Sequence, residues 1–360
     1  MKIAFISFYS GRASRGVESF VHELANKLSK SNEISVYQAG ERVADTKYKT
    51  IVSKIKVDWQ KSDTSESLIK RAFMSYWSRR VFRFTVGILN DLKMKQHDVI
   101  VPMNGPAMTL PLKLFTLYSR QKIVIIGESG VGWDDRINLY TFPSRFVAIS
   151  TKALGWTKRI NPFVKNTYIP NGVDTNKFKQ KGPQIRHGLE GKTILCVSAL
   201  VPSKRVDRVV RAVSKIEDTS LLIVGSGSQE DQIQELGDKL LGSNRFKILK
   251  LPYEEMPKVY RSVDLFTLAS EGYYAFEIVL IEAMASGLGV VANDDSIRRE
   301  IVGDAGLFVD PEDINDYVKK IKQALGKNWG DLPRMQAGKF SWDIVTGKYE
   351  ELFKELINGY

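Results

Sequence analysis

One stretch of the chain, Asp264 to Val291, limits the possible folds more than any other. It begins with a short apolar run, Leu265 to Leu268, of the kind that forms a buried parallel strand. After a polar loop, apolar residues recur at helical spacing from Phe276 to Ala285, and Gly287 occupies the position of a C-cap glycine. Another apolar run, Leu288 to Ala292, follows. This order predicts a βαβ unit, in which a ligand would bind beside the loop that follows the first strand.

The same alternation of apolar runs and helical patterns extends over most of the 360 residues, which are enough for two domains of ordinary size. We therefore expect an α/β fold with two doubly wound, Rossmann-like domains. The first would comprise residues 1–170 and an amphipathic C-terminal helix, 341–360, and the second residues 171–340. Tyr168 to Phe178, YIPNGVDTNKF, contains the Pro, Asn and Gly residues expected of a hinge between them.

The apolar patterns give approximate bounds for the elements. Strands are expected at residues 2–8, 33–37, 99–102, 122–126, 145–149, 193–198, 221–224, 246–249, 265–268, 288–292 and within 300–310. Helices are expected at residues 17–29, about 66–95, 110–119, 206–215, 256–262, 276–285 and 340–356. Residues 127–136, GESGVGWDDR, are expected to form a glycine-rich loop in which Asp134 and Asp135 are turn-formers.

The charge is unevenly distributed. Lysine and arginine number 53 against 41 aspartate and glutamate, which gives a net charge of +12. Residues 1–170 contain 27 basic and 13 acidic side chains, whereas residues 171–360 contain 26 and 28. The excess in the first half indicates an anionic partner for that half. No nucleic-acid-binding module is recognisable, so nucleic acid is not the expected partner.

The segment from Glu66 to Lys95 combines aromatic residues with many cations and few acids. That composition suits the interface of an anionic bilayer. The alternative is a core helix whose arginine stems cover apolar surface. Because the basic excess lies in the same half, we favour contact with a membrane surface or an acceptor. The residues expected to make this contact are Arg12 and Arg15 in an earlier loop, and Arg71, Trp77, Arg79, Arg80 and Arg83.

Three features bear on localisation. The first residues, MKIAFISFYSG, form too short an apolar run for a signal sequence. No run approaches the roughly 18 apolar residues of a membrane-spanning helix. The one cysteine, Cys196, excludes an internal disulfide. We expect a cytoplasmic protein that lies peripherally on the inner face of the cell membrane.

Three loops carry candidates for binding a phosphate. Residues 9–16 are rich in Gly, Ser and Arg, and backbone N–H groups near Gly16 would attract an anion, unless the loop is a plain tight turn. Lys204 and Arg205 precede a helix and suit a diphosphate, although a solvated lysine is the plainer interpretation of this position. Gly225 follows a strand and permits close backbone approach to a phosphate. The G-x-G-x-x-G fingerprint is incomplete there, because its third glycine is Glu230, and this argues against a dinucleotide oxidoreductase.

The stretch FEIVLIEAMASGLGVVA resembles the signature of the retaining glycosyltransferases called group 1, or family 4, which runs E-x-F-G-x-x-x-x-E-A-M-A-x-G-x-P-V-V-A. The resemblance implies that Glu282, which matches the second glutamate, binds the ribose of a nucleotide sugar. The first glutamate, near the donor sugar, is Tyr274 here, and Glu277 replaces the glycine that follows Phe276. Glu277, or alternatively Glu271, is therefore expected to make the donor-sugar contact.

Other segments are also similar to the family. SALVPSKR resembles x-x-G-R-L-x-x-x-K-G, which matches Lys204 to the family's lysine but lacks the family's arginine, whose charge Arg205 could supply. IPNGVDTNKF resembles the segment that joins the two domains. Gly16 begins a stretch similar to the second half of G-G-x-E, and Glu128 stands where the family often has a histidine that approaches the donor.

The resemblance implies the GT-B fold, in which two Rossmann-like domains face a cleft, and a glycosyltransferase that retains the anomeric configuration of its nucleotide-sugar donor. The acceptor would be a lipid-linked or other cell-envelope glycan precursor. No metal or other cofactor is expected, and the three histidines lack the spacing of metal ligands. The implied catalytic residues are Glu277, Lys204 and Glu128, and the donor-binding residues are Gly16, Lys204, Arg205, Gly225, Glu271, Tyr274, Phe276, Glu277 and Glu282.

The departures from the family pattern at Tyr274 and Glu128 leave a second interpretation open. In that interpretation the chain has the same fold and binds a nucleotide sugar or a lipid headgroup without catalysing a reaction. Binding of a ligand without turnover would distinguish this second interpretation from the first.

Overall fold

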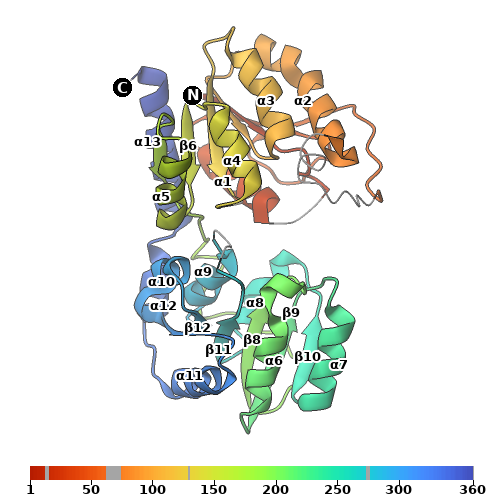
Figure 1. Cartoon of the computed structure of the whole chain (residues 1–360), viewed down its shortest axis with the longest axis vertical. Helices are drawn as coiled ribbons and strands as arrows, with labels where there is room; N and C mark the ends of the chain where they lie inside the picture. The colour runs from red at the N-terminus through yellow and green to blue at the C-terminus, as the bar shows by residue number, and fades with distance from the viewer. Residues whose placement is uncertain (13–15, 62–73, 129, 273–275, 360) are drawn as a thin grey trace. The chain divides into compact units, whose positions relative to one another are not determined.

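The computed structural model describes residues 1–12, 16–61, 74–128, 130–272 and 276–359. The chain divides into two compact units (Figure 1): an N-terminal unit, Met1–Asn171 with Trp342–Tyr360, and a C-terminal unit, Gly172–Ser341. Each boundary lies one residue from the expected position. Three of the predicted site residues, Arg15, Arg71 and Tyr274, lie outside the described residues.

The N-terminal unit contains a seven-stranded sheet in the order β3-β2-β1-β4-β5-β6-β7, and every neighbouring pair is parallel. Its strands are β1 (Lys2–Ile6), β2 (Glu33–Gln38), β3 (Lys49–Val52), β4 (Val99–Pro102), β5 (Lys122–Gly127), β6 (Arg145–Ala148) and β7 (Asn166–Tyr168). The strands are almost continuously apolar, as expected of parallel strands that helices cover on both faces.

The helices of this unit are α1 (Gly16–Leu28), α2 (Tyr76–Lys95), α3 (Pro106–Thr116), α4 (Trp133–Tyr140), α5 (Thr151–Ile160) and α13 (Trp342–Asn358). One face of the sheet contributes Ala4 and Ile6 to a core that includes buried residues of α2, α3 and α4. Helices α1 and α13 pack against each other elsewhere, with the rings of Phe20 and Trp342 5.7 Å apart. The C-terminal helix α13 thus belongs to the N-terminal unit.

The C-terminal unit contains a six-stranded parallel sheet in the order β10-β9-β8-β11-β12-β13. Its strands are β8 (Lys192–Val197), β9 (Thr219–Val224), β10 (Phe246–Leu249), β11 (Leu265–Leu268), β12 (Val290–Asn293) and β13 (Gly306–Val309). Its α-helices are α6 (Val206–Ser214), α7 (Glu230–Leu240), α8 (Met256–Tyr260), α9 (Ile278–Ala285), α10 (Ser296–Val302), α11 (Ile314–Gly326) and α12 (Leu332–Gly338).

Successive strand residues of this sheet point to opposite faces, so each face has its own core. Leu195 joins the core beneath α8, α9, α10 and α12, whereas Ile194 and Cys196 join the core beneath α6, α7 and α11. Both units are therefore three-layered α/β sandwiches of the Rossmann type, and the predicted fold class is confirmed.

Several expected bounds were wrong. The strands β3 and β7 were missed because they have only four and three residues, too few for a clear pattern. Asp134 and Asp135 lie in the first turn of α4 and not in a loop. The strand expected within residues 300–310 is β13, and the helix α10 before it was missed. Helix α9 begins at Ile278, and Glu277 is its N-cap residue in an extended conformation rather than a residue of the helix.

The order of the strands locates the position where a ligand is expected. In the C-terminal sheet the direction of winding reverses between β8 and β11. Ligands of open parallel sheets bind beyond the carboxyl ends of the two strands at such a point. The loops after β8 and β11 contain Lys204 and Glu271, and α9 follows the second loop.

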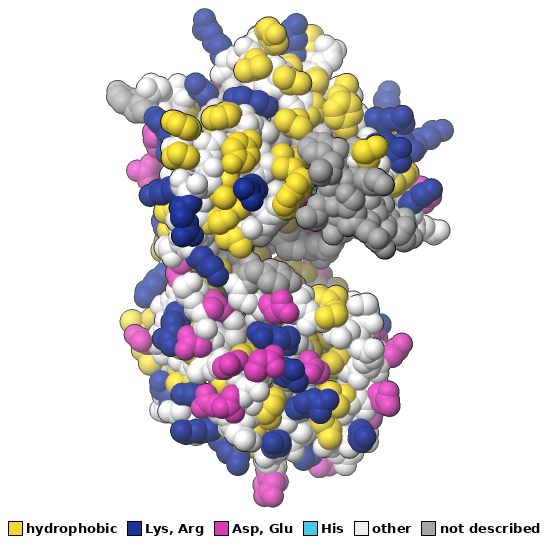
Figure 2. All heavy atoms as spheres, viewed as in Figure 1, with side chains coloured by type: hydrophobic (Ala, Val, Ile, Leu, Met, Phe, Trp, Pro, Cys, Tyr) yellow, Lys and Arg dark blue, Asp and Glu magenta, His cyan; other side chains and the backbone are white. Residues whose placement is uncertain are grey.

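The surfaces of the two units differ in composition. On the face shown in Figure 2, acidic and basic side chains alternate on the C-terminal unit, while hydrophobic and basic side chains prevail on the N-terminal unit. None of the described helices is both long and apolar enough to cross a bilayer.

Candidate active site

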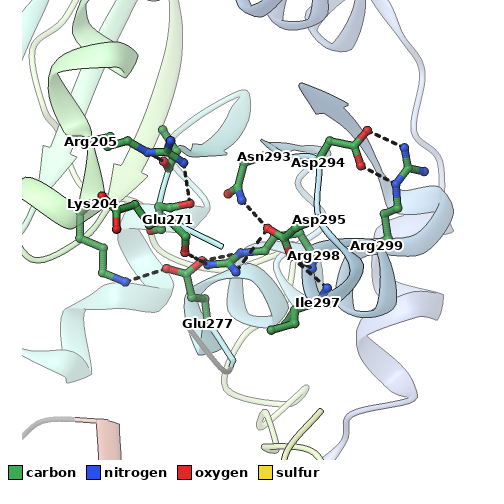
Figure 3. Close-up of polar contacts among 12 residues, drawn as sticks. Lys204, Arg205, Glu271, Glu277, Asn293, Asp294, Asp295, Ile297, Arg298 and Arg299 are labelled. Atoms are coloured by element: carbon green, nitrogen blue, oxygen red, sulfur yellow. Dashed lines mark hydrogen bonds and ion pairs between the residues drawn. The ribbon is translucent and has the colours of Figure 1, made fainter. Parts of the chain in front are cut away.

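Lys204 lies directly beyond the end of β8. It ends a short 3-10 turn, Pro202–Lys204, and Arg205 follows with a φ of 47° before α6 begins. The Lys204 side chain is largely buried, and its Nζ lies 2.7 Å from Oε1 of Glu277 (Figure 3). A lysine and a glutamate 73 positions apart thus meet at the carboxyl ends of β8 and β11.

Arg298 contacts the other oxygen of Glu277. Its Nη2 and Nε donate to Glu277 Oε2 over 2.7 and 3.1 Å, and its side chain is fully buried. On its far side, Arg298 Nη1 lies 3.4 Å from Oδ2 of Asp295. Lys204, Glu277, Arg298 and Asp295 therefore form a row of alternating charges, which we call the charge row (Figure 3). In such a row each ion fixes the position of the next.

Glu277 is an anion in this arrangement. Burial alone would raise the pKa of its carboxyl group, but the charges of Arg298 and Lys204 outweigh burial and hold the pKa below its ordinary value. Both carboxylate oxygens already accept hydrogen bonds from cations. The prediction that Glu277 contacts a donor sugar remains a prediction; the contacts seen are those with Lys204 and Arg298.

Arg298 was not predicted as a site residue, because helix α10 was not expected from the sequence. A signal for this helix was present: Asp295 is an N-cap residue whose Oδ1 accepts hydrogen bonds from the backbone N–H groups of Ile297 and Arg298 over 2.9 and 3.0 Å. Aspartate before residues with apolar positions 297, 301 and 302 is the usual mark of a helix start. The pairing of Arg298 with Glu277 had no such signal.

Arg205 holds the loop after β11. Its Nε donates to the carbonyl of Ala269 over 2.8 Å and its Nη2 to that of Ser270 over 3.0 Å. Its Nη1 lies 3.4 Å from Glu312. The backbone of Glu271 is bound as well, since its N–H donates to the carbonyl of Ser203 over 3.0 Å. Arg205 thus stabilises the loop backbone, which differs from the role of free positive charge suggested by the sequence.

Glu282 lies in the middle of α9 and is buried. The hydroxyl of Tyr260 donates to Glu282 Oε2 over 2.9 Å. Burial raises the pKa of Glu282 to about 7, against the smaller opposing effects of hydrogen bonds from Tyr260 and Tyr253. The carboxyl group is therefore near its titration midpoint at neutral pH. Neither tyrosine was predicted as a site residue, because nothing in their sequence spacing links them to α9.

Two further predicted donor-binding residues have structural roles. A Cβ on Gly225 would lie 1.9 Å from the carbonyl oxygen of Ser198, so the close approach of the ends of β8 and β9 requires glycine there. Phe276 packs its ring 5.8 Å from that of Phe340 within the core. Neither role excludes contact with a ligand.

The predicted site residues of the first domain lie in the N-terminal unit. Gly16 is the first residue of α1. Glu128 follows β5, and burial raises its pKa to about 7, with Glu18 adding to the effect and a hydrogen bond from Asn171 opposing it. This raised pKa makes Glu128 a second carboxyl group that titrates near neutral pH.

The segment predicted to contact a membrane is described from residue 74 onward. In α2, Val81, Phe84, Ile88 and Leu92 are buried in the core, and Arg79 and Arg83 are exposed on the other side. Three other predicted residues make contacts with aromatic rings. The ring centroids of Trp77 and Trp59 are 5.9 Å apart. The guanidinium carbon of Arg80 lies 5.2 Å from the ring centroid of Tyr76, and that of Arg12 lies 6.0 Å from the ring centroid of Trp59. The helix is therefore a core helix with a basic outer face, and contact of that face with a membrane remains a prediction.

Comparison with known proteins supports the resemblance for the C-terminal unit. Residues 177–338 match the family model described as glycosyl transferases group 1. The chain is 35% identical over 203 residues to a phosphatidyl-myo-inositol mannosyltransferase of Mycolicibacterium smegmatis, a match that covers 53% of this chain and 52% of the relative. It is 30% identical over 205 residues to an exopolysaccharide phosphotransferase of Streptomyces coelicolor, covering 53% of this chain and 21% of the relative. The chain thus spans about half or less of the length of these curated relatives.

Solved structures match the whole fold. The sucrose-phosphate synthase of Thermosynechococcus elongatus superposes with a TM-score of 0.80 at 16% identity, covering 99% of both chains. The Anabaena protein HepE, in complex with UDP and glucose, superposes with a TM-score of 0.75 at 16% identity, covering 98% of this chain and 99% of the other. At such identities the likeness concerns the fold, and it agrees with two Rossmann-like domains of the GT-B type.

Proposed function

We propose that this protein is a glycosyltransferase that moves a sugar from a nucleotide-diphosphate donor to a lipid-linked or other cell-envelope glycan acceptor, with retention of anomeric configuration. The observation that carries the proposal is the meeting of Lys204 and Glu277 at the switch point of the C-terminal sheet, with Glu282 on the adjacent helix α9. These residues lie within the segment, residues 177–338, that matches the glycosyltransferase family model.

In this proposal the C-terminal unit holds the donor. Glu282 accepts hydrogen bonds from the ribose hydroxyls, and Lys204 neutralises the diphosphate. The bond between the anomeric carbon and the diphosphate oxygen breaks, and a bond to the acceptor oxygen forms on the same face of the sugar. The acceptor proton moves to the departing diphosphate. Positive charge placed in advance at the leaving group is an effective way to stabilise such a transition state, and no metal or other cofactor is part of the proposal.

Glu277 then acts mainly through Lys204. Arg298, which is itself paired with Asp295, fixes the position of the Glu277 carboxylate. Glu277 in turn holds the ammonium group of Lys204 in a fixed position near the carboxyl end of β8. A lysine held in place loses less conformational freedom when it meets a diphosphate than a mobile lysine does. A direct contact between Glu277 and the donor sugar is compatible with this role.

We further propose that the protein works in the cytoplasm at the inner face of the cell membrane. The support is the excess of 14 positive charges in residues 1–170 and the basic outer face of α2. A relative of similar sequence is named as a mannosyltransferase of phosphatidyl-myo-inositol, which is a membrane lipid.

The test is a screen of nucleotide-sugar donors for transfer to acceptors in a membrane extract, with the wild-type chain and the Lys204→Gln variant. We expect transfer from at least one donor and a loss of about 100- to 1,000-fold in rate for the variant, the range for removal of one group that stabilises developing charge. Lys192→Gln is the matched control, because Lys192 begins the same strand that Lys204 follows and pairs with Asp264 at the other end of the sheet.

Two results would count against the proposal. If the chain binds nucleotide sugars but transfers none of them to any acceptor or to water, it is a binding protein on the same fold. If Lys204→Gln and Lys192→Gln lower the rate equally, the site does not lie beyond β8.

A further inference from the structure

The N-terminal unit exposes apolar side chains that neither its core nor the proposed donor site uses. Of the described residues with large, exposed apolar side chains, fifteen belong to this unit and three to the C-terminal unit. Seven of the fifteen lie on helices α3 and α4 or directly after them. One is Trp133, at the start of α4, and the other six we call the α3–α4 surface: Leu110, Leu114, Leu117, Tyr118, Tyr140 and Phe142.

The outer side of α3 is apolar along its whole length. Leu110, Leu114 and Leu117 recur at the spacing that aligns residues on one side of a helix, and Tyr118 follows. The last three are 63%, 62% and 93% exposed. The inner side of the helix is apolar too, since Met108 and Leu112 are fully buried in the core. A helix that covers a sheet normally has a polar outer side. The apolar outer side of α3 therefore indicates a surface that binds another molecule.

The apolar residues of α3 and α4 are neighbours in space. Lys113 of α3 donates from Nζ to the backbone carbonyl of Phe142 over 2.6 Å, which holds the end of α4 against α3. The hydroxyl of Tyr140 reaches the carbonyl of Ile160 at the end of α5 over 3.3 Å. Figure 2 shows hydrophobic side chains gathered on this part of the N-terminal unit, which Figure 1 labels α3 and α4.

The surroundings of this surface are basic. Residues 106–165 contain nine lysine and arginine residues against three acids. Within that range of the described chain, Asp134 is the only exposed acid, since Asp135 is buried and Glu128 is partly buried. The exposed cations are Arg120, Arg136, Lys152, Lys158, Arg159 and Lys165. Apolar side chains bordered by cations fit a surface that offers hydrocarbon beneath a layer of negative charge.

We propose that the α3–α4 surface docks on an anionic lipid bilayer, with its leucine and aromatic side chains inserted among the headgroups and the surrounding cations bound to lipid phosphates. The proposal rests on the proposed action at a membrane and names the surface that makes the contact. It moves the main contact from the segment predicted from the sequence, around α2, to α3 and the end of α4. On α2 the exposed apolar residues are Phe82, Val86 and Met94, fewer than on and directly after the two neighbouring helices together.

Sedimentation with lipid vesicles tests the proposal. The wild-type chain should bind vesicles of phosphatidylcholine with one third phosphatidylglycerol and should bind pure phosphatidylcholine weakly. The combined variant Leu114→Gln/Leu117→Gln/Tyr118→Ser should bind anionic vesicles at least about tenfold more weakly than wild type, because it removes apolar area that would enter the bilayer.

The variant Lys158→Gln/Arg159→Gln tests the contribution of charge. Its affinity for anionic vesicles should fall about fivefold per charge removed at low salt and much less at high salt. Leu332→Gln/Met335→Gln, at exposed apolar positions of the C-terminal unit, is the matched control and should bind like wild type.

A fluorescent probe tests insertion directly. Cys196 is fully buried and burial raises its pKa to about 12, so it is a poor target for thiol reagents. Leu117→Cys therefore introduces one reactive thiol, to which an environment-sensitive dye can be attached. Its emission should shift to the blue when anionic vesicles are added, whereas the same dye at Leu240→Cys should not respond.

The proposal is overturned if the α3 variant binds anionic vesicles as well as wild type, or if the dye at position 117 does not respond. If Phe82→Gln/Val86→Gln loses more affinity for anionic vesicles than the α3 variant does, the contact lies on α2 and the proposal is likewise overturned. If the wild-type chain is a dimer that the α3 variant dissociates, the surface is a subunit interface and the proposal fails. Nucleotide binding by the variants should equal that of wild type, so these failures are separate from a failure of the proposed transferase.

Discussion

Glu277 and Glu282 lie at the start and in the middle of one helix and are almost equally buried, 6% and 4% exposed, yet their acidities differ. Two cations, Arg298 and Lys204, hold the pKa of Glu277 below its ordinary value. Glu282 has a tyrosine hydroxyl as its partner, and burial raises its pKa to about 7. The comparison shows that the cations around a buried carboxyl group, more than its depth, decide whether it is charged.

The largest effect that tests this comparison is expected at Arg298. Arg298→Gln removes one member of a buried ion pair and leaves Glu277 with less compensation, which typically costs about 3–5 kcal/mol. The free energy of unfolding, from denaturant titration, should fall by about that amount. Arg299→Gln is the matched control, since this neighbouring arginine pairs with Asp294 on the surface and its loss should have little effect. Equal effects of the two substitutions would contradict the importance of the charge row.

The second prediction concerns the pH dependence of stability. Glu282 ionises near pH 7 in the folded chain and near its ordinary pKa, 4.5, in the unfolded chain. Between these values the unfolded state loses its proton first, so the folded state should lose up to about 3 kcal/mol of stability as pH rises from 4.5 to 7. Glu282→Gln should remove this loss, as measured by denaturant titration over that pH range.

Glu277 should behave in the opposite way. Its folded pKa is lowered, so its contribution to stability is present above its ordinary pKa and is lost as pH falls below that value. Glu277→Gln should therefore reduce the loss of folding stability at acidic pH. It should leave unchanged the pH dependence of stability between pH 4.5 and 7. Similar pH profiles of the Glu277→Gln and Glu282→Gln variants would refute the contrast between the two carboxyl groups.

The third prediction concerns nucleotide affinity. If Glu282 accepts hydrogen bonds from a ribose, its carboxylate binds better than its neutral form, so affinity for a nucleoside should rise as pH increases through 7. Glu282→Gln should weaken binding by about 1.5–3 kcal/mol at pH 8, the range for hydrogen bonds to a charged group. Calorimetry at pH 6 and pH 8 measures both effects, and a folded variant with unchanged affinity would remove Glu282 from the site.

The smallest expected effect is the coupling between Lys204 and Glu277. Lys204→Gln should weaken binding of a nucleoside diphosphate more than binding of the nucleoside. The loss should be smaller by about 1 kcal/mol in a Glu277→Gln background, because the carboxylate no longer holds the ammonium in place. A double-mutant cycle by calorimetry measures this difference, and additivity within about 0.5 kcal/mol would show that the two residues act independently.

The sequence was sufficient for those parts of the molecule that depend on local patterns. The apolar runs around Leu195 and Leu265 predicted β8 and β11, the two strands at whose carboxyl ends the site lies. Lys204 and Glu282 could be singled out because short motifs surround them. These features depend on neighbours within a few positions along the chain.

The charge row could not be predicted in the same way. Glu277 and Arg298 are 21 positions apart and Lys204 and Glu277 are 73 positions apart, so no periodicity relates them. The partner of Glu282, Tyr260, lies on another helix, and without it the environment of that carboxyl group is unknown. The α3–α4 surface was missed for a related reason: an apolar residue in a sequence looks the same whether it faces the core or the solvent.

The position of α13 has a consequence for the order of folding. This last helix supplies Trp342, Val345 and Tyr349 to the buried interior of the N-terminal unit, beside α1. During synthesis, residues 172–341 are complete before the ribosome has made the segment that the N-terminal unit needs. The second unit can therefore reach its native structure while the first still has an unfilled side next to Phe20. A nascent or truncated chain that ends near residue 341 should expose this side and become a target for chaperones and proteases.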